Sequence, residues 1–432
     1  MAAEWIECKL KDACSSVDYG LTAPAVDDSS GPRFLRITDI ATKDIDWKSV
    51  PHVKTDADTI EKYLLHDGDI VLARTGASTG ASAYIKNPPV AVFASYLVRL
   101  KAAPQFDSRF IAYFLKSNYF WDFIHSVLGD KSAQPNASAS TMTQVRLRAP
   151  KSKTNQQAIS KILASFDDKI ELNYRMNETL EAMAQAIFKS WFVDFDPVHA
   201  KAEGRDPGLP KHIADLFPSS FEDSELGEIP TGWIAGKLND ITELQNGYAF
   251  SSADWLEYGV PVVKIGSVKP GIVDLSQVSY VSEQVASDLS RFRLQAGDLL
   301  IGMTGYVGEV GLVPHTSNSP LLNQRVGRFI LKERGTAALA FVYCYARQNQ
   351  FKSLVESKSH GTAQANVSAE GILSIPLVIP KESLRDAFNN LCRPLFDRLL
   401  ANHAESNTLS LLRDSLLPKL ISGEIKVSGA IN

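Results

Sequence analysis

The longest regular pattern of apolar positions lies between residues 156 and 190. Apolar or small residues recur there in alternating steps of four and three, with two asparagines at the centre of the series. The positions are Ile159, Leu163, Phe166, Ile170, Asn173, Asn177, Leu180, Ala184 and Ile187. This heptad spacing predicts a helix that pairs with another helix. At about 1.5 Å per residue, the helix is roughly 50 Å long.

A second helix with the same pattern is predicted 229 residues further along the chain. Its matching positions are Phe388, Cys392, Leu395, Leu399, Asn402, Ser406, Leu409, Arg413 and Leu416. Polar residues at such positions cost stability but fix the register of paired helices. We therefore expect the two helices to pair antiparallel, with Asn173 and Asn177 against Asn402 and Ser406. The alternative is two separate surface helices, and Pro394 either kinks the second helix or marks its first turn.

Nearly the same offset relates the segments that precede the two helices. The Gly-Asp, apolar run and Thr-Gly of residues 68–76 recur at 297–305, and the Ala-Gln-x-Asn-x-Ser of residues 133–138 recurs at 363–368. Solenoid repeats are only about 20–50 residues long. The long period therefore indicates a duplicated domain.

Each copy is predicted to be a mixed α/β module. The short apolar runs at 69–73 and 298–301 end in glycine and are typical of buried strands. The aromatic-rich stretches at 108–128 and 338–355 are typical of amphipathic helices. The expected fold class is α/β (α+β), with two homologous modules separated by two long helices that form an antiparallel coiled coil with pseudo-two-fold symmetry.

Composition narrows the class of protein. The chain has 432 residues, of which 44% are hydrophobic and 22% charged, which is ordinary for a globular protein. Its four cysteines form no CxxC pair, which indicates no disulfide framework and fits a reducing, cytoplasmic location. No apolar run approaches the roughly 18 residues of a membrane span. The net charge is −4, and an acidic excess is concentrated in residues 201–232.

Three motifs suggest chemistry, and each is better explained otherwise. Residues 76–80, Gly-Ala-Ser-Thr-Gly, match the G-x-S-x-G nucleophile elbow, but a strand is predicted where the elbow needs a helix. Asn87-Pro88-Pro89 resembles the signature of adenine N6-methyltransferases, but Val90 replaces the aromatic that stacks on the base. The histidines are scattered and form no metal-binding motif. We therefore assign no catalytic, cofactor-binding or metal-binding residue.

Three other stretches resemble the specificity subunit of type I restriction–modification systems. They are AIFKSWFVDFDPV at 186–198, LGEIPTGW at 226–233 and LPKLISGEI at 417–425. The resemblance covers essentially the whole chain and implies two target-recognition domains. The implied division is 1–152 for the first recognition domain, 153–195 for the central helix, 196–232 for a connector, 233–381 for the second recognition domain, 382–420 for the distal helix and 421–432 for a tail.

The resemblance implies a DNA-binding function without chemistry on this chain. Each recognition domain would read one half of a bipartite double-stranded DNA site, and the helices would set the gap and dock two modification (methyltransferase) subunits. S-adenosylmethionine would be carried by the modification subunits, and ATP with Mg by restriction (translocase/endonuclease) subunits. The assembled complex would be an adenine N6-methyltransferase and an ATP-dependent endonuclease.

The residues that contact DNA are expected in loops of the two modules. Glutamine and asparagine pair with adenine, while arginine and lysine pair with guanine or phosphate. The candidates are Arg74, Thr75, Ser78, Lys131, Gln134, Asn136, Thr304, Tyr306, Arg325, Lys358, Gln364 and Asn366. The alternative for each is a structural role in its loop, and the duplication of the Gln/Asn motif favours that alternative.

Two other functions stay open from the sequence. A methyltransferase-like enzyme that uses Asn87-Pro88-Pro89 would itself bind S-adenosylmethionine. A coiled-coil scaffold with two protein-binding modules would not bind DNA.

Overall fold

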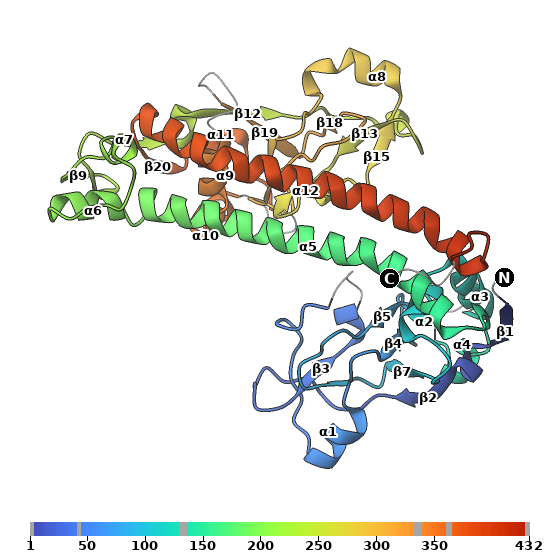
Figure 1. Cartoon of the computed structure of the whole chain (residues 1–432). Coiled ribbons are helices and arrows are strands. Elements are labelled where there is room, and N and C mark those ends of the chain that lie inside the picture. Colours follow the sequence, from blue (N-terminus) through green and yellow to red (C-terminus); the bar gives the residue numbers. More distant parts are fainter. Residues whose placement is uncertain (1–3, 41–44, 129–135, 332–338, 360–364, 428–432) are drawn as a thin grey trace. The chain divides into compact units, whose positions relative to one another are not determined.

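The computed structural model describes residues 4–40, 45–128, 136–331, 339–359 and 365–427 (Figure 1). The chain forms two compact units, unit 1 with residues 1–169 and 409–432 and unit 2 with residues 170–408. The two long helices, α5 (Lys153–Phe192) and α12 (Glu382–Ser422), each contribute a part to both units. None of the described helices contains a stretch that is both long and apolar enough to cross a membrane.

Module 1, residues 5–150 of unit 1, is a small mixed α/β domain. Its antiparallel sheet has the strand order β2 (Cys14–Tyr19), β7 (Leu97–Ala102), β4 (Ile70–Ala73) and β5 (Ser82–Tyr84). Two further strand pairs are the parallel β3 (Arg33–Leu35) with β6 (Ala91–Phe93) and the antiparallel β1 (Trp5–Lys9) with β8 (Arg146–Pro150). The helices are α1 (Ala57–Tyr63), α2 (Ser108–Phe114), α3 (Asn118–Leu128) and α4 (Ala139–Met142), with 3-10 turns η1 (Leu10–Ala13) and η2 (Ile37–Ile40).

Module 2, residues 234–379 of unit 2, repeats this arrangement. Its main sheet has the strand order β12 (Thr242–Asn246), β19 (Val326–Leu331), β16 (Leu299–Gly302), β17 (Val310–Leu312) and β14 (Gly271–Ile272). The remaining strands form the sheet β15 (Ser279–Val281), β13 (Val260–Val263) and β18 (Leu321–Leu322) and the pair β11 (Ile234–Lys237) with β20 (Pro376–Ile379). The helices are α8 (Glu283–Asp288), α9 (Leu339–Ala346), α10 (Asn349–Ser357) and α11 (Ala369–Leu373), with 3-10 turns η3 (Leu238–Asp240), η4 (Ser252–Asp254), η5 (Ile265–Ser267) and η6 (Ser290–Phe292).

The predicted duplication and fold class are therefore confirmed. The sheet β2-β7-β4-β5 corresponds strand by strand to β12-β19-β16-β17, and the parallel pair β3-β6 corresponds to β13-β18. The strand predicted at 69–73 is β4, and the one predicted at 298–301 is β16. All four residues of each strand are buried, as their Ile-, Val- and Leu-rich sequences require.

The stretches 108–128 and 339–355 are helical as predicted, but each is broken in the middle and forms two helices. Ser117 separates α2 from α3: its hydroxyl donates to the Phe114 carbonyl at 2.6 Å and accepts from the Phe120 N–H at 3.4 Å. A side chain that bonds the last carbonyl of one helix and the first amide of the next favours a helix end over continuation. Gln348 separates α9 from α10 at the corresponding place.

The two long helices also end at different residues from those predicted. The central helix ends at Phe192 rather than 195, and Phe195 has a left-handed backbone with φ +54°. The distal helix ends at Ser422 rather than 420, where Gly423 with φ +79° follows and stops it. Pro394 lies inside α12, so its alternative placement in the first turn is wrong.

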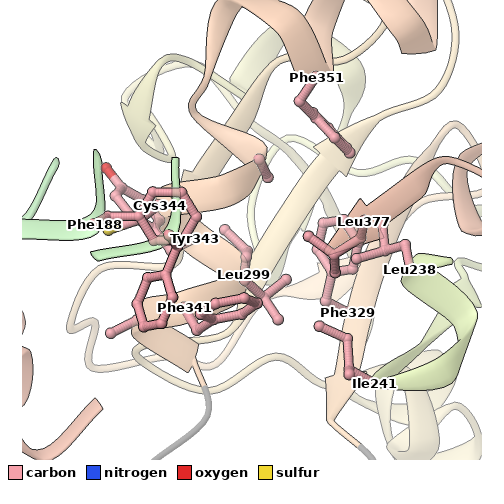
Figure 2. Packing of buried hydrophobic residues seen from close by; sticks show 14 of the residues in the cluster. Phe188, Leu238, Ile241, Leu299, Phe329, Phe341, Tyr343, Cys344, Phe351 and Leu377 are labelled. Atoms are coloured by element: carbon pink, nitrogen blue, oxygen red, sulfur yellow. The ribbon is translucent and has the colours of Figure 1, made fainter. Parts of the chain in front are cut away.

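An aromatic cluster joins both helices to module 2 within unit 2. Phe188, Trp191 and Phe192 of α5 pack on Phe388 of α12 with ring centroids 5.2–5.9 Å apart. Phe188 and Phe192 also lie 5.4 Å and 5.0 Å from Phe341 of α9, and Figure 2 shows Phe188 beside this helix. The aromatic residues of the 186–198 stretch therefore form a core that holds the helices to the module.

The connector is folded as well. Its elements are α6 (Asp196–Ala202), α7 (Lys211–Ala214) and the hairpin of β9 (Phe221–Ser224) with β10 (Gly227–Pro230). The Lys201 ammonium donates to the Ala214 and Phe217 carbonyls and so ties α6 to the segment around α7.

Candidate nucleic-acid interface

Two turns lie side by side at one edge of each module. The first, the glycine turn, follows β4 in module 1 and β16 in module 2. The second, the strand turn, joins β6 to β7 and β18 to β19. The Arg74 N–H donates to the Tyr96 carbonyl at 3.1 Å, and the Met303 N–H donates to the Arg325 carbonyl at 3.0 Å. The same backbone bond therefore holds the two turns together in both modules.

The duplicated Asn-x-Ser motif adds a third loop to this edge. Asn136 forms an antiparallel bridge with Thr75, and Asn366 forms the same bridge with Thr304. The serines that follow, Ser138 and Ser368, accept a backbone N–H and begin α4 and α11. Repetition of these residues thus has a structural cause, since they fix the loop to the glycine turn and start a helix.

Only Oδ1 of each asparagine side chain takes part in the hydrogen bonds described next. The Thr304 hydroxyl donates to Oδ1 of Asn366 at 2.9 Å, and Nη2 of Arg74 donates to Oδ1 of Asn136 at 3.4 Å. Both asparagines are exposed to solvent. Their amide groups remain exposed at the edge where the three loops meet.

In module 2 the three loops surround a polar hollow of about 390 Å³. Its lining is Thr304 from the glycine turn, Gln324 and Arg325 from the strand turn, and Asn366 from the third loop. The described residues of this lining present a guanidinium, two amides and a hydroxyl, and no carboxylate is among them. Such a surface suits a ligand with hydrogen-bond acceptors.

In module 1 the same edge carries other side chains. The Arg74 guanidinium lies 5.1 Å from the centre of the Tyr19 ring, which is within the range of a cation–π contact. Tyr96, at the position of Arg325, is 60% exposed. Arginine and tyrosine side chains at one edge can donate hydrogen bonds to DNA phosphates.

The structure brings together about half of the candidate DNA-binding residues. Arg74, Thr75 and Asn136 meet in module 1, and Thr304, Arg325 and Asn366 meet in module 2. Three of the predicted DNA-binding residues, Lys131, Gln134 and Gln364, lie outside the described residues.

The other three candidates take no part in these contacts. Ser78 is half-buried in the glycine turn and is followed by β5, so the residue has no nucleophile elbow. Tyr306 is 60% exposed, with Nζ of Lys269 5.5 Å from its ring centre. Lys358 follows α10 and does not line the hollow.

Sequence reasoning missed Gln324, Tyr19 and Tyr96. The signal for two of them was present, because the offset of 229 that relates the modules also pairs Ser95-Tyr96 with Gln324-Arg325. The same offset pairs Tyr19 with Tyr248 in the sequence, whereas in the structure the counterpart of Tyr19 is Asn246, in the register of β12.

The residues predicted to set the register of the helix pair meet within unit 2. Nδ2 of Asn173 donates to the Asn402 carbonyl at 3.3 Å and to Oγ of Ser406 at 3.2 Å. Nδ2 of Asn402 donates to Oδ1 of Asn177 at 2.9 Å, and Nδ2 of Asn177 donates to the Leu399 carbonyl at 3.3 Å. As the residue number increases along α5 from Asn173 to Asn177, the residue number of the bonded partner on α12 decreases, so the two helices run antiparallel.

The described residues bring together no group of three His, Cys, Asp or Glu side chains that could hold a metal ion. The Asn87-Pro88-Pro89 motif forms a turn between β5 and β6. Asn87 has φ +44°, and its N–H donates to Oδ1 of Asp67 at 2.8 Å.

Fold and surface together define a class of protein: two copies of one polar-edged recognition module carried on an antiparallel helix pair. The model of the type I restriction modification DNA specificity domain matches residues 5–182 and 230–383. These ranges are more than half of the chain, and the chain belongs to this family of DNA specificity subunits.

Two relatives are similar over most of their length. The HindI specificity subunit of Haemophilus influenzae is 27% identical over 409 residues, which covers 84% of this chain and 88% of that protein. The MjaIX specificity subunit of Methanocaldococcus jannaschii is 26% identical over 328 residues, which covers 74% and 69%. The S subunit of a type I restriction–modification system from M. genitalium has the same fold, with a TM-score of 0.54, 15% identity and coverage of 97% and 96%.

Proposed function

We propose that this chain gives a type I restriction–modification complex its DNA specificity by reading a bipartite double-stranded site, one half with each module. The observation that carries the proposal is the duplicated three-loop edge. Its backbone bonds are the same in both modules, while the exposed side chains differ. Two copies of one frame with different side chains suit two half-sites of different sequence.

The DNA-contacting residues of this proposal are the candidates named from the sequence together with those that share their edge. In module 1 they include Arg74, Thr75 and Asn136, and in module 2 Thr304, Arg325 and Asn366. The same proposal includes contacts with DNA by six further residues, which are Ser78, Lys131, Gln134, Tyr306, Lys358 and Gln364.

The helix pair acts in this proposal as a ruler and as a docking surface. Large apolar side chains are exposed along it, among them Leu172 and Met183 of α5 and Leu391 and Leu411 of α12. Two modification subunits would dock there and bring S-adenosylmethionine, and restriction subunits would bring ATP and Mg.

Membership of a specificity family implies a non-catalytic role for the chain. The two alternative functions find no support in the comparisons. A methyltransferase-like enzyme would depend on Asn87-Pro88-Pro89, which forms a turn. A scaffold without DNA binding would leave the duplicated polar edge without a use.

A map of methylated adenine in host DNA, with and without this chain beside its methyltransferase partner, tests the proposal. Loss of methylation from a split motif, two short blocks around a fixed gap, is the expected result. Loss from a single continuous motif would favour the enzyme. No loss, with the partner shown to be expressed, would contradict a specificity function.

A further inference from the structure

An arginine occupies different positions of the same frame in the two modules. The residues joined by the bond between the glycine turn and the strand turn are Arg74 and Tyr96 in module 1, and Met303 and Arg325 in module 2. The arginine therefore stands on the glycine turn in module 1 and on the strand turn in module 2. The backbone hydrogen bond between the two turns has nearly the same length in the two modules, 3.1 Å and 3.0 Å. The two modules therefore share this backbone contact and differ in the side chains beside it.

The two arginines have different surroundings. Arg74 is half-buried, packs over the Tyr19 ring and bonds the Asn136 side chain. Arg325 is exposed and lines the hollow beside Gln324. Within the described part of the chain, no side-chain hydrogen bond or ion pair is formed by the Arg325 guanidinium.

The chemistry of the hollow favours a base edge over a phosphate. A guanidinium presents two parallel N–H groups that match O6 and N7 of guanine in the major groove, and a glutamine amide matches N6 and N7 of adenine. Phosphate oxygens also accept hydrogen bonds from guanidinium and amide groups, but a phosphate contact carries no sequence information, and the side chains at this turn differ between the two modules. A guanidinium and an amide on adjacent residues can read two neighbouring bases.

We infer that the strand turn Asn323–Arg325 carries the base specificity of module 2, with Arg325 reading a guanine in its half-site. This inference rests on the proposed function. Module 1 has Ser95 and Tyr96 at the same turn, so it reads no guanine from this position. The exchange of the arginine between two neighbouring positions makes the two half-sites different.

The test uses the full chain assembled with its methyltransferase subunit, acting on a randomised DNA library whose methylated members are sequenced. The variants are Arg325→Ala and Arg325→Lys, and the matched control is Arg205→Ala, which removes an exposed arginine of the connector. We expect Arg325→Ala to lower discrimination at one guanine position by about 5- to 150-fold and to leave the other half-site unchanged. Arg325→Lys is expected to lower discrimination at the same position by a smaller factor, because an ammonium still donates to O6 or N7 of guanine but lacks the guanidinium fork. The control keeps the original motif.

Three results would overturn the inference. The first is an unchanged motif in Arg325→Ala. The second is a loss of methylation in Arg325→Ala that is equal at all sites, whether partial or complete, together with normal methylation in Arg325→Lys. This result would indicate a phosphate contact. The third is assembly, measured by gel filtration, that fails in both variants, which marks a structural role. None of these three results contradicts the proposed function. That function would be contradicted if the wild-type complex methylated no split motif.

Discussion

At the scale of single residues, the repeated positions are those that the backbone needs. Gly76 and Gly80 have φ +75° and +98°, and their counterparts Gly305 and Gly308 have φ +76° and +81°. Asn136 and Ser138 bridge and cap in the same way as their copies. Sequence comparison of the two halves therefore finds the frame of the site. The side chains that face a ligand differ between the halves, so Gln324 and Tyr96 are found through the positions that the offset pairs and not through a repeated residue type.

A pair of glycine substitutions tests this frame. A Cβ at Gly76 would meet nothing within 4 Å, whereas one at Gly80 would lie 3.1 Å from Cγ2 of Ile124 and 3.2 Å from the Trp121 ring. We expect Gly76→Ala to lower the free energy of unfolding by about 1 kcal/mol from the left-handed backbone. Gly80→Ala should cost about 2–4 kcal/mol, because crowding adds to the strain. Denaturant titrations followed by tryptophan fluorescence compare the two, and equal losses would contradict the described packing.

The cysteines give a prediction about pH. Burial raises the pKa of the Cys14 and Cys392 thiols from 9.0 to about 12, so both stay protonated in the folded chain at pH 8. Since the thiolate is the reactive form, iodoacetamide should modify them slowly in the native chain and rapidly after denaturation. A folded pKa above the unfolded value gives stability that is complete below pH 9 and is lost as the pH rises toward 12. Rapid native alkylation of either thiol at pH 8, shown by peptide mass analysis, would refute this.

At the scale of elements, the heptad pattern was the most informative part of the sequence. It predicted both long helices, their polar centre and their antiparallel pairing, because its signal is repeated over many turns. The helices of the modules were predicted less well, since periodicity does not detect the side-chain bonds of Ser117 or the extended backbone of Gln348, which break the two stretches. The end of α12 is set by Gly423, whose left-handed backbone directly follows Ser422. Phe195, which is also left-handed, precedes α6, so the chain between Phe192 and Asp196 is no longer part of α5.

The polar centre of the helix pair should act on register more than on stability. Asn173→Ala removes donors to Asn402 and Ser406 and is expected to lower the free energy of unfolding by about 1–3 kcal/mol. Replacing Asn173 and Asn402 together with leucine should raise the midpoint of thermal unfolding but permit other helix pairings. Gel filtration would then show additional oligomers. Asn407→Ala, on an exposed position of α12, is the control and should change neither property; a single sharp species in the double leucine variant would argue against a register role.

At the scale of the whole molecule, the repeat makes one chain serve as a pair of related readers. Duplication was visible in the sequence because the offset of about 229 residues is kept through the modules and the helices. The proposed ruler follows from this plan. A helix pair between two readers fixes their separation only if its length is fixed.

The ruler predicts the effect of a longer helix pair. One heptad added at the polar centre of each helix lengthens the pair by about 10 Å, which corresponds to about three base pairs of DNA. We expect the complex to methylate sites whose gap is longer by about that amount, measured on a library of sites with varied gaps. Seven Gly/Ser residues inserted after Asp206, an exposed connector position, should leave the gap unchanged. Methylation confined to the original gap in the heptad variant would contradict the ruler.

The composition of unit 1 has a consequence for how the chain is made. Its core contains Leu417, Leu420 and Ile421 of α12 beside Leu10, and Gly423 lies against the Trp5 ring. Unit 2, in contrast, is one continuous stretch from 170 to 408. At about 5–20 residues per second, the ribosome delivers residues 409–422 roughly 10–50 s after residue 169. The part that is synthesised first therefore lacks a segment of its core until residues 409–422 have been made, whereas the sequence of unit 2 is complete at residue 408.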